Sequence, residues 1–329
     1  MTVLDGLRSA GFRAAGNLLS RGGEGRRLVI LHYHRVPESP DPMCPDLLER
    51  QAFAVHMRAL AEHFNVVPLA EAIARLRDGT LGPRAVAITF DDGYADNYQV
   101  ALPVLRHFGL HATFFVAAGF LDGGCMFNDL VIEACRVAPP GAWDTGLAGA
   151  GTCHVTDGPG RVRLANQLIG RLKYLAGPDR LGAALQLLHA AGGRPPDHLM
   201  MTSDEVRSLH RAGMAIGGHT LSHPILARLV ADEAAREISS GKAALENLLG
   251  APVPLFAYPN GKPGTDYLSR DVALARGAGF DAAVTTVWAS ATRNGDAFEI
   301  PRVGSWDRSR DRFCARLLRC YRQLPATAA

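Results

Sequence analysis

Two aspartates stand side by side where a buried strand is expected to end. The segment Ala85–Phe90, AVAITF, is apolar or β-branched throughout, and Asp91, Asp92 and Gly93 follow it directly. Neighbouring carboxylates repel each other, and burial penalises the charged form of both. The pair therefore needs a compensating cation or a place in a solvated turn. A DDG turn, or an aspartate that caps the next helix, explains the pair equally well.

Two histidines four residues apart are the candidate ligands for such a cation. His219 and His223 lie in GGHTLSHP, and this spacing puts both on one face of a helical turn. Imidazole is the commonest neutral metal ligand, although an H-x-x-x-H pair alone is also common in structural roles. Two histidines and one carboxylate leave an open coordination position, which is typical of catalytic zinc and non-haem iron sites. One aspartate could bind the cation while its neighbour acts as a general base.

The elements around these residues alternate between strands and helices. Helical patterns, such as 48–64, 69–77, 97–108 and 231–249, lie between strand-like segments at 28–34, 85–90, 112–117, 214–219, 254–259 and 281–286. This alternation predicts a parallel sheet covered by helices, and about seven strands favour a barrel. The active-site residues of such folds lie at the carboxyl ends of the strands. His34, the aspartate pair and the histidine pair all follow predicted strands.

A less regular stretch interrupts the alternation. Residues 121–200 contain APPGAWDTGLAGAGTCHVTDGPG, which we expect to be a loop flanked by helices. The barrel resumes at Thr202 and Glu205, which fit a helix capping box. The expected organisation is an N-terminal amphipathic helical extension at 1–27, a barrel at 28–120 and 201–307, a helical insertion at 121–200, and a C-terminal helix and tail at 308–329. We expect the insertion, which follows the end of a strand, to cover a groove and tune substrate choice.

Three motifs resemble those of the polysaccharide deacetylases, the NodB-homology enzymes of carbohydrate esterase family 4. They are TFDDGYADN, GGHTLSHP and FAYPNG, and the resemblance extends from residue 28 to about residue 305 outside the insertion. The TFDDG and H-[ST]-x-x-H motifs in this order are highly specific. The resemblance implies a distorted (β/α) barrel with a divalent cation, most often Zn²⁺, that hydrolyses N-acetyl groups on sugars.

The resemblance also implies a role for each matching residue. Asp91 is similar to the general base of the family, while Asp92, His219 and His223 are similar to its metal ligands. Arg302, in EIPRVGSWD, is predicted to pair with Asp91 and hold it ionised, although a purely structural arginine is nearly as good an interpretation.

The FAYPNG motif resembles the loop that lines the substrate groove in this family. Its residues Tyr258, Pro259, Asn260 and Gly261 are therefore predicted to bind substrate, with the backbone N–H of Asn260 directed at the oxyanion. Many relatives have an aromatic residue where this chain has Asn260, so this wall of the groove departs from the family pattern.

The catalytic acid also departs from the common pattern. Common members carry an acid histidine near the C-terminus, whereas this chain has no histidine after His223. A circularly permuted subgroup carries it near the N-terminus in a YH motif, which LHYHRV matches, so His34 is the predicted acid. His32 would share its strand face and is interpreted as a core or supporting histidine. Trp288 and Trp306 could stack on a sugar ring, although such aromatics are more often core residues.

Composition argues against several other classes of protein. The chain of 329 residues is 47% hydrophobic and 20% charged, which is enough apolar material for a large core. A formal net charge of +3 is too small to favour a nucleic-acid-binding protein. No window holds the roughly 20 apolar residues that a membrane span needs. The six cysteines have irregular spacing and no C-x-x-C pair, which is typical of free thiols in a reducing compartment.

The first 27 residues have a basic amphipathic pattern. Asp5, Arg8 and Arg13 interrupt any apolar run of signal-peptide length, and Arg21 adds to the basic face. The pattern predicts a helix that packs on its own domain or, alternatively, lies on a membrane surface. We therefore expect a cytoplasmic protein, with peripheral membrane contact as the alternative.

Together these features predict a metal-dependent N-deacetylase acting on an N-acetylated carbohydrate, which is a polysaccharide, an oligosaccharide or a lipid-linked glycan. Asp91 would take a proton from water, and protonated His34 would give one to the leaving sugar nitrogen. A hydrolase of another amide, such as a formylated sugar or a non-sugar C–N bond, would use the same residues. A non-catalytic carbohydrate-binding barrel would need a broken acid–base set, and here every expected group has a candidate.

Overall fold

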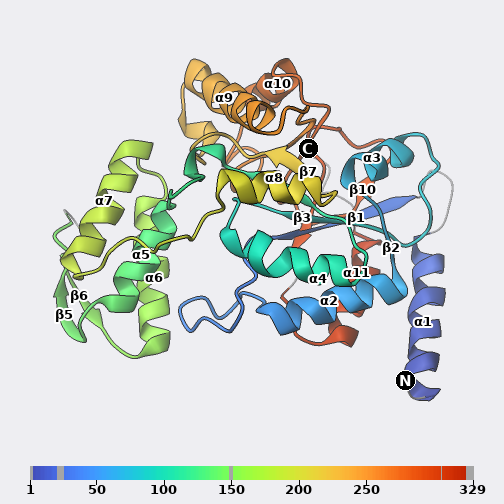
Figure 1. Ribbon diagram of the computed structural model, residues 1–329, viewed down its shortest axis with the longest axis horizontal. Helices are drawn as coiled ribbons and strands as arrows, with labels where there is room; N and C mark the ends of the chain where they lie inside the picture. The colour runs from blue at the N-terminus through green and yellow to red at the C-terminus, as the bar shows by residue number, and fades with distance from the viewer. Residues whose placement is uncertain (1–2, 21–25, 148–150, 305, 324–329) are drawn as a thin grey trace.

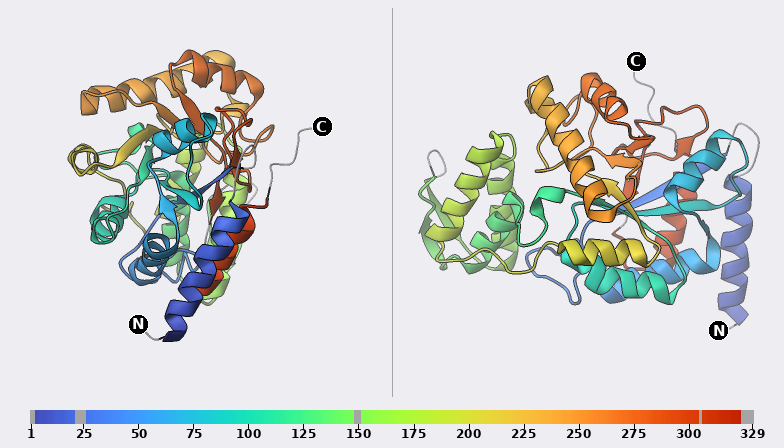
Figure 2. Two further views of the ribbon diagram at one scale, coloured as in Figure 1. Left: turned by 90° about the vertical axis from the view of Figure 1, so that its right-hand side faces the viewer. Right: turned by 45° about the horizontal axis from the view of Figure 1, so that its top comes forward.

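The computed structural model describes residues 3–20, 26–147, 151–304 and 306–323, with side chains from residue 10 onward. The first helix, α1 (Val3–Leu19), packs beside the last one, α11 (Arg310–Cys320), as Figure 2 shows. The basic face predicted around Arg8 and Arg21 lies outside the described side chains. Within the described part of the chain, no helix has the length and apolar character that crossing a bilayer requires.

A curled sheet forms the centre of the molecule (Figure 1). Six strands run parallel to their neighbours in the order β1 (Arg27–Tyr33), β3 (Ala85–Phe90), β4 (Thr113–Val116), β7 (Ala215–Gly218), β8 (Leu255–Ala257) and β9 (Ala282–Val284). Three short strands add to this path: β2 (Asn65–Val66), β10 (Ala291–Thr292) and β11 (Val303–Gly304). Among the described strands of this sheet, β10 alone is antiparallel, and it pairs with β1. The predicted distorted barrel is therefore confirmed.

The strands are apolar because both faces of the sheet are covered. Every residue of β3 is buried, as is expected for a parallel strand between two layers of side chains. One apolar cluster packs β1, β3 and β4 against the outer helices, and a second includes Leu28, Ile30 and Phe115 on the other face.

The segment from Ile300 to Gly304 closes the curl. Val284 at the end of β9 bridges to Ile300, and the Thr285 N–H donates to the Ile300 carbonyl at 2.8 Å. A few residues later, Val303 of β11 pairs with Leu31 of β1. The same short segment therefore contacts both ends of the sheet, and it carries Arg302 into the interior.

Helices and single turns cover the outside of the sheet. They are α2 (Arg50–His63), α3 (Leu69–Arg77), α4 (Leu102–His107), α8 (Ser203–Arg211), α9 (Ala231–Leu249), α10 (Ser269–Gly277), and the turns η2 (Asn97–Ala101), η3 (Ala118–Phe120) and η4 (Leu226–Arg228). The capping box predicted at Thr202 and Glu205 is confirmed at the start of α8. η2 is one turn of π-helix that leads into α4.

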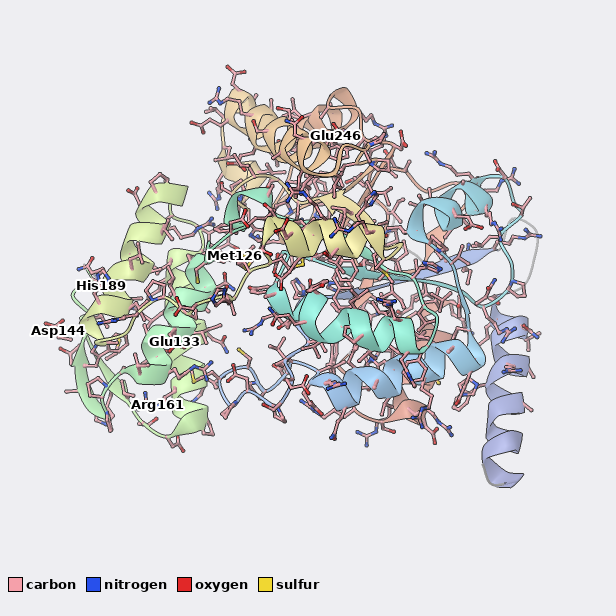
Figure 3. All side chains as sticks on the ribbon, viewed as in Figure 1. Met126, Glu133, Asp144, Arg161, His189 and Glu246 are labelled. Atoms are coloured by element: carbon pink, nitrogen blue, oxygen red, sulfur yellow. The ribbon has the colours of Figure 1, made fainter. Side chains whose placement is uncertain are left out.

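A helical lobe lies at the left of Figure 1, at the far end of the molecule from α1. It contains α5 (Phe127–Val137), α6 (Gly158–Leu172), α7 (Gly177–Ala190) and an antiparallel hairpin of β5 (Gly141–Asp144) and β6 (Thr152–Val155). Arg161 of α6, labelled in Figure 3, donates to the Cys135 and Ala138 carbonyls at 2.6 and 2.8 Å and ties α6 to the end of α5. The lobe has its own apolar cluster.

The hairpin corrects the expectation of a plain loop. β5 and β6 pair from Gly141 with Val155 to Asp144 with Thr152, and Trp143 and Val155 are buried against the helices of the lobe. The surrounding glycines and prolines mask these four-residue strands in the sequence, because tertiary packing rather than local propensity stabilises them.

Candidate metal and acid–base site

The predicted site residues meet at the carboxyl ends of β1, β3 and β7, with β4 lying between β3 and β7. The Asp91 N–H donates to the Tyr33 carbonyl at 2.9 Å, which holds the end of β3 beside the end of β1. The His219 N–H donates to the Val116 carbonyl at 3.1 Å, which places the end of β7 beside β4. His34 is anchored by Asn97 of the π-helical turn, whose side-chain amide donates to the His34 carbonyl at 2.7 Å.

A left-handed backbone at Asp92 lets the side chains of the two aspartates point to different sets of histidines. Consecutive side chains of an extended strand point to opposite faces. Asp92 has φ +79°, which L residues rarely adopt, and Gly93 continues the turn at φ +95°. The alternation therefore breaks at Asp92 itself. Asp91 joins His32 and His34, while Asp92 joins His219 and His223.

Asp92, His219 and His223 form a cluster with the geometry of a metal site. Asp92 Oδ1 lies 3.3 Å from Nε2 of His219 and 3.3 Å from Nε2 of His223. Ligand atoms held 2.0–2.1 Å from a tetrahedral zinc ion lie about 3.3 Å apart. Asp92 Oδ1 is also buried and accepts no hydrogen bond within the described part of the chain. These three residues therefore fit a divalent cation.

Surrounding groups orient the two imidazoles. His219 Nδ1 lies 2.7 Å from the Ala257 carbonyl at the end of β8, so it donates there and leaves Nε2 for the cluster. The His223 N–H donates to Thr220 Oγ1 at 3.1 Å, and both Thr220 and His223 have left-handed backbones with φ +64° and +52°. An irregular loop, rather than the helical turn considered from the spacing, brings the two histidines together.

Burial and mutual charge shift the pKa values in the cluster. Burial raises the pKa of Asp92, but the His219 and His223 imidazoles outweigh it and lower the value to about 2. Burial, with the charges of His219 and Arg180, lowers the pKa of His223 to about 4. Burial also opposes protonation of His219, yet Asp92 and Asp91 raise its pKa.

Asp91 is paired with the buried Arg302, as predicted. Nη1 and Nη2 of Arg302 donate to the two carboxylate oxygens, each at 2.7 Å. Arg302 is itself held by the Thr89 hydroxyl at 3.0 Å and the Thr285 carbonyl at 2.9 Å. Burial raises the pKa of Asp91, but the charge and hydrogen bonds of Arg302 overcome it and keep the pKa well below its usual range. The carboxylate is thus ionised and fixed in orientation.

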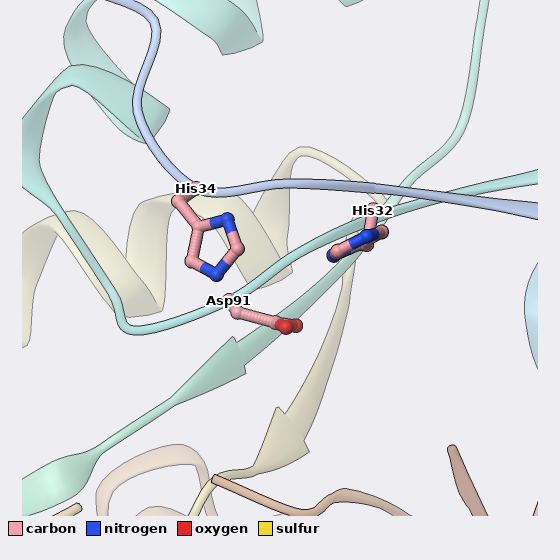
Figure 4. A group of neighbouring side chains, drawn as sticks. All are labelled: His32, His34 and Asp91. Carbon is pink, nitrogen blue, oxygen red and sulfur yellow. The ribbon is translucent and has the colours of Figure 1, made fainter. Parts of the chain in front are cut away.

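The imidazoles of His34 and His32 come from one segment, and both lie beside Asp91 (Figure 4). His34 is exposed, whereas His32 is half-buried and its Nδ1 has no hydrogen-bond partner in the described structure. Burial and the charge of Arg302 lower the pKa of His32 to about 3, so it is neutral at physiological pH. Although these three side chains also form a possible ligand group, Arg302 already places a fixed positive charge on Asp91, which disfavours a cation there.

The FAYPNG segment brings its backbone, and not the Tyr258 side chain, to the edge of the site. The Tyr258 side chain is 0% exposed and stacks on Tyr267 at 4.0 Å, so it cannot touch a substrate in this structure. Pro259 is also buried, while Asn260 is half-buried with φ +60°. The Gly261 N–H donates to the Pro259 carbonyl at 2.7 Å, which makes a tight turn directly after β8.

Comparison with known proteins identifies the family. Residues 78–138 and 183–283 match the family model described as polysaccharide deacetylase. The chain belongs to the polysaccharide deacetylase family. The match includes Asp91, Asp92, His219 and His223 and omits residues 139–182 of the helical lobe. β1 and His34 also lie outside it, so the predicted role of His34 depends on its geometry.

Individual relatives of this deacetylase-family chain are distant in sequence. It is 22% identical over 279 residues to "Putative polysaccharide deacetylase YxkH" of Bacillus subtilis. The aligned region covers 84% of this chain and 71% of the relative. Among solved structures, the Streptococcus pyogenes deacetylase PplD in complex with acetate matches with a TM-score of 0.59 at 18% identity, covering 90% of this chain and 98% of PplD. IcaB from Ammonifex degensii matches with a TM-score of 0.56 at 22% identity, covering 89% and 97%. These likenesses concern the fold.

Other residues of this family member lie at the site, although the sequence did not predict them. A cavity of about 270 Å³ contains His34 and Asp92 together with Tyr94 and Asp129, which comes from the helical lobe. The Tyr94 hydroxyl donates to Asp129 at 3.1 Å, and burial raises the pKa of Asp129 to about 7. A single aspartate in a segment without a recognisable motif gives no sequence signal of this placement.

Proposed function

We propose that the protein is a metal-dependent hydrolase that removes N-acetyl groups from a carbohydrate. The observation that carries the proposal is the pair of adjacent groups at one edge of the barrel. Asp92, His219 and His223 offer three converging ligand atoms, and Asp91 and His34 stand beside them. Membership of the polysaccharide deacetylase family supports the substrate class, and the acetate in the PplD structure supports the acyl group.

Asp92, His219 and His223 would hold the cation, which we propose to be Zn²⁺ because two imidazoles and one carboxylate suit it. When bound, such a cation polarises an amide carbonyl and makes water more acidic. The carboxylate of Asp92 and the neutral imidazole of His223 are in the protonation states that ligands require.

Asp91 is proposed as the general base. Its low pKa keeps it ionised at physiological pH, and Arg302 holds both of its oxygens in place. Each carboxylate oxygen has two lone pairs, so the hydrogen bonds from Arg302 leave one on each oxygen for a proton from the attacking water. A fixed base avoids the entropic cost of ordering a mobile side chain during the reaction.

His34 is proposed as the general acid that protonates the leaving sugar nitrogen. It is exposed and lines the cavity that also contains Asp92, whereas His32 has a pKa of about 3 and carries no proton to give at neutral pH. Without a proton donor, the amine would have to leave as a strongly basic anion.

The turn after β8 is proposed to bind the acyl oxygen through the backbone N–H of Asn260. Its support is its place at the same edge of the sheet, since the Ala257 carbonyl at the base of this turn accepts the hydrogen bond from His219. Backbone donors that are already fixed stabilise an oxyanion without reorganisation. Pro259 and Gly261 shape this turn, and Tyr258 supports it from the core.

Acid release from a panel of N-acetylated sugars tests this function. The purified protein is assayed with and without a chelator, its metal content is measured, and the released acid is identified. We expect acetate, loss of activity with chelator and recovery with Zn²⁺. Formate from formylated sugars alone would point to the other amide hydrolase, and no acid from any substrate by metal-loaded protein would overturn the proposal. The predicted cytoplasmic location is tested separately by cell fractionation.

A further inference from the structure

Arg180 of α7 is a buried cation that lacks a carboxylate partner. The residue is 8% exposed, and burial lowers the pKa of its guanidinium. Nη1 and Nη2 lie 3.4 Å from the Lys173 and His223 carbonyls, which is long for a hydrogen bond, and the guanidinium lies 4.6 Å from the Phe127 ring centroid. No carboxylate pairs with it in the described part of the chain. Arginine is rarely buried this far without a paired anion, which makes Arg180 a candidate anion ligand.

Arg180 lines a cavity between the helical lobe and the barrel. The cavity has a volume of about 690 Å³, within the range of sites that hold small organic molecules. Its walls come from the junction of α6 and α7, the segment after β7 and the first half of α9. Figure 1 shows the start of α7 on the side of the lobe toward α9. The lining residues include Ser222 and Pro224 but not Asp92, His219 or His223, so the cavity borders the loop that carries His223 and is separate from the proposed metal ligands.

Basic side chains outnumber acidic ones in this cavity. The charged residues that line it are Lys173, Arg180, Arg228, Arg236, Glu233 and Glu237. Glu237 already accepts hydrogen bonds from the Leu221 and Ser222 N–H groups at 3.0 and 2.8 Å, and these stabilise its charge. Among the described residues, no ion pair joins any of the four cations to a carboxylate. The wall therefore keeps an excess of two positive charges.

The start of α7 adds backbone donors to the same wall. α7 has 14 residues, its N-cap is Ala176, and no side chain caps it. The unpaired N–H groups and the dipole of such a helix favour an anion at its first turn, where Gly177 and Pro178 line the cavity. Asp179, the acidic residue of this turn, is exposed and does not line the cavity. The helix start and the buried guanidinium therefore favour the same kind of ligand.

A phosphate group matches this cavity better than a carboxylate does. A phosphate monoester carries about 1.5 to 2 negative charges at neutral pH and has three strong acceptor oxygens. A carboxylate has a single charge, which would leave half of the excess positive charge unpaired. The planar fork of an arginine also fits phosphate oxygens in pairs. Beside the cations, Tyr174 is 47% exposed and lines the cavity with Ile225 and Leu229, which offer apolar contact to the organic part of a ligand.

We propose that this cavity binds the phosphate group of an organic molecule, with Arg180, Arg228 and Arg236 as its ligands. The phosphate supplies the counter-charge that Arg180 lacks within the described chain. The site is independent of the proposed deacetylase function, since no candidate catalytic or metal-ligating residue lines it. A soluble organic phosphate and the headgroup of a phospholipid share this chemistry, so the probes include both.

Isothermal titration calorimetry on the full chain tests the site. The probes are glucose 6-phosphate and glucose, which differ only by the phosphate group, and the proteins are wild type, Arg236→Gln and Arg228→Gln. We expect wild type to bind glucose 6-phosphate and not glucose. Each substitution should raise Kd by about tenfold, because a charge-assisted hydrogen bond is lost. Unchanged binding in both variants would overturn the proposal.

Arg163→Gln is the matched control, because Arg163 is exposed on α6 of the same lobe and does not line the cavity. This substitution changes the net charge by the same amount, so it should leave Kd unchanged if binding is local. Circular dichroism establishes that each variant is folded. Equal losses in Arg163→Gln and Arg236→Gln would mean that the whole surface attracts the anion, and would refute the site.

Asp92→Asn separates this site from the proposed metal ligands. It should bind glucose 6-phosphate as wild type does. Loss of binding in Asp92→Asn, with full binding in Arg236→Gln, would place the phosphate at the metal ligands and contradict the cavity site. Acetate release plays no part in these measurements, so failure of the deacetylase function and failure of this site are distinguishable.

Co-sedimentation with vesicles distinguishes the two sources of phosphate. Phosphatidylcholine vesicles that contain phosphatidic acid carry the lipid monoester, and phosphatidylcholine alone is the control. Binding of glucose 6-phosphate without sedimentation would support a soluble ligand. Sedimentation with phosphatidic acid that Arg236→Gln loses would support a lipid headgroup. Wild type that binds neither glucose 6-phosphate nor these vesicles would show that the cavity takes no phosphate.

Discussion

At the scale of single residues, the proposed site depends on two carboxylates that have different neighbours. Both carboxylate oxygens of Asp91 accept hydrogen bonds from Arg302. Asp92 Oδ1 instead faces two imidazoles and accepts no hydrogen bond in the described structure. Asp91 is therefore satisfied within the protein, whereas Asp92 Oδ1 keeps a free acceptor position for the proposed cation. Substitutions that remove one set of contacts should leave the other intact.

Asp91→Asn should abolish turnover without removing the metal. Asparagine keeps the shape of the side chain but cannot accept the proton, so we expect acetate release to fall by about two to four orders of magnitude. Metal content, measured by plasma mass spectrometry, should match that of wild type. Asp92→Asn is the paired control and should lose both activity and metal. Near wild-type turnover in folded Asp91→Asn would rule out the base assignment.

Arg302→Met should make stability depend on pH in a specific direction. Removing Arg302 leaves Asp91 as a buried, unpaired charge, which costs about 3–5 kcal/mol near pH 7. In wild type the depressed pKa of Asp91 supplies stability above the unfolded-state pKa, and this stability is lost as pH falls through the folded-state value. In the variant Asp91 takes up a proton more readily, so its deficit should shrink as pH falls.

Urea unfolding at neutral and acidic pH measures this deficit. The control is Arg276→Met, because Arg276 forms an exposed pair with Asp296 at 2.6 Å and should change stability little at either pH. A deficit in Arg302→Met that stays constant from neutral to acidic pH would contradict the assignment of the pair.

His34→Ala and His32→Gln should differ in their effect on the rate. We expect His34→Ala to lower kcat by about two to four orders of magnitude, because the leaving amine loses its proton donor. His32→Gln should cost much less, since burial already keeps His32 neutral. Steady-state acetate release measures both variants. A normal rate in His34→Ala, or a larger loss in His32→Gln, would move the acid role away from His34.

At the scale of elements, an arginine of the helical lobe contacts the loop that carries His223. Arg180 of α7 is buried, its guanidinium lies 4.6 Å from the Phe127 ring centroid, and Nη2 is 3.4 Å from the His223 carbonyl. It also lowers the pKa of His223, after the larger effect of burial. The lobe therefore supports the loop whose left-handed backbone presents His223 to the cluster.

Arg180→Met should weaken metal binding while the lobe stays folded. Groups behind metal ligands typically change affinity by about tenfold or more when removed. Zinc affinity is measured by competition with a chromogenic chelator. Arg163→Met, at an exposed position of α6 in the same lobe, is the matched control and should leave affinity unchanged. Equal affinities in the two variants would mean that the lobe does not support the cluster.

At the scale of the whole molecule, local patterns predict elements and their order well. Apolar periodicity locates β3, α3 and α9 to within a residue, and the barrel follows from strand–helix alternation. These features depend on neighbouring residues and on general rules of chain connection. The proposed ligand set and the proposed base rest on motifs whose spacing is typical of one chemistry.

The rest depends on contacts between distant segments. The left-handed backbone at Asp92, the burial of Tyr258 and the π-helical turn that presents Asn97 to His34 have no local signature. The hairpin of the helical lobe is likewise specified by burial of Trp143 rather than by its glycine-rich sequence. Tertiary packing overrides propensity at such positions, as is common near functional sites.

The closing segment of the barrel has a consequence for protein synthesis. Arg302 follows Asp91 by 211 positions, so the ribosome makes the carboxylate long before its counter-charge. Chains are synthesised from the N-terminus at about 5–20 residues per second, so Asp91 spends many seconds without its partner. A nascent or prematurely terminated chain that ends before Arg302 cannot complete this pair. Completion of the buried pair at the strand ends is thus coupled to completion of the chain.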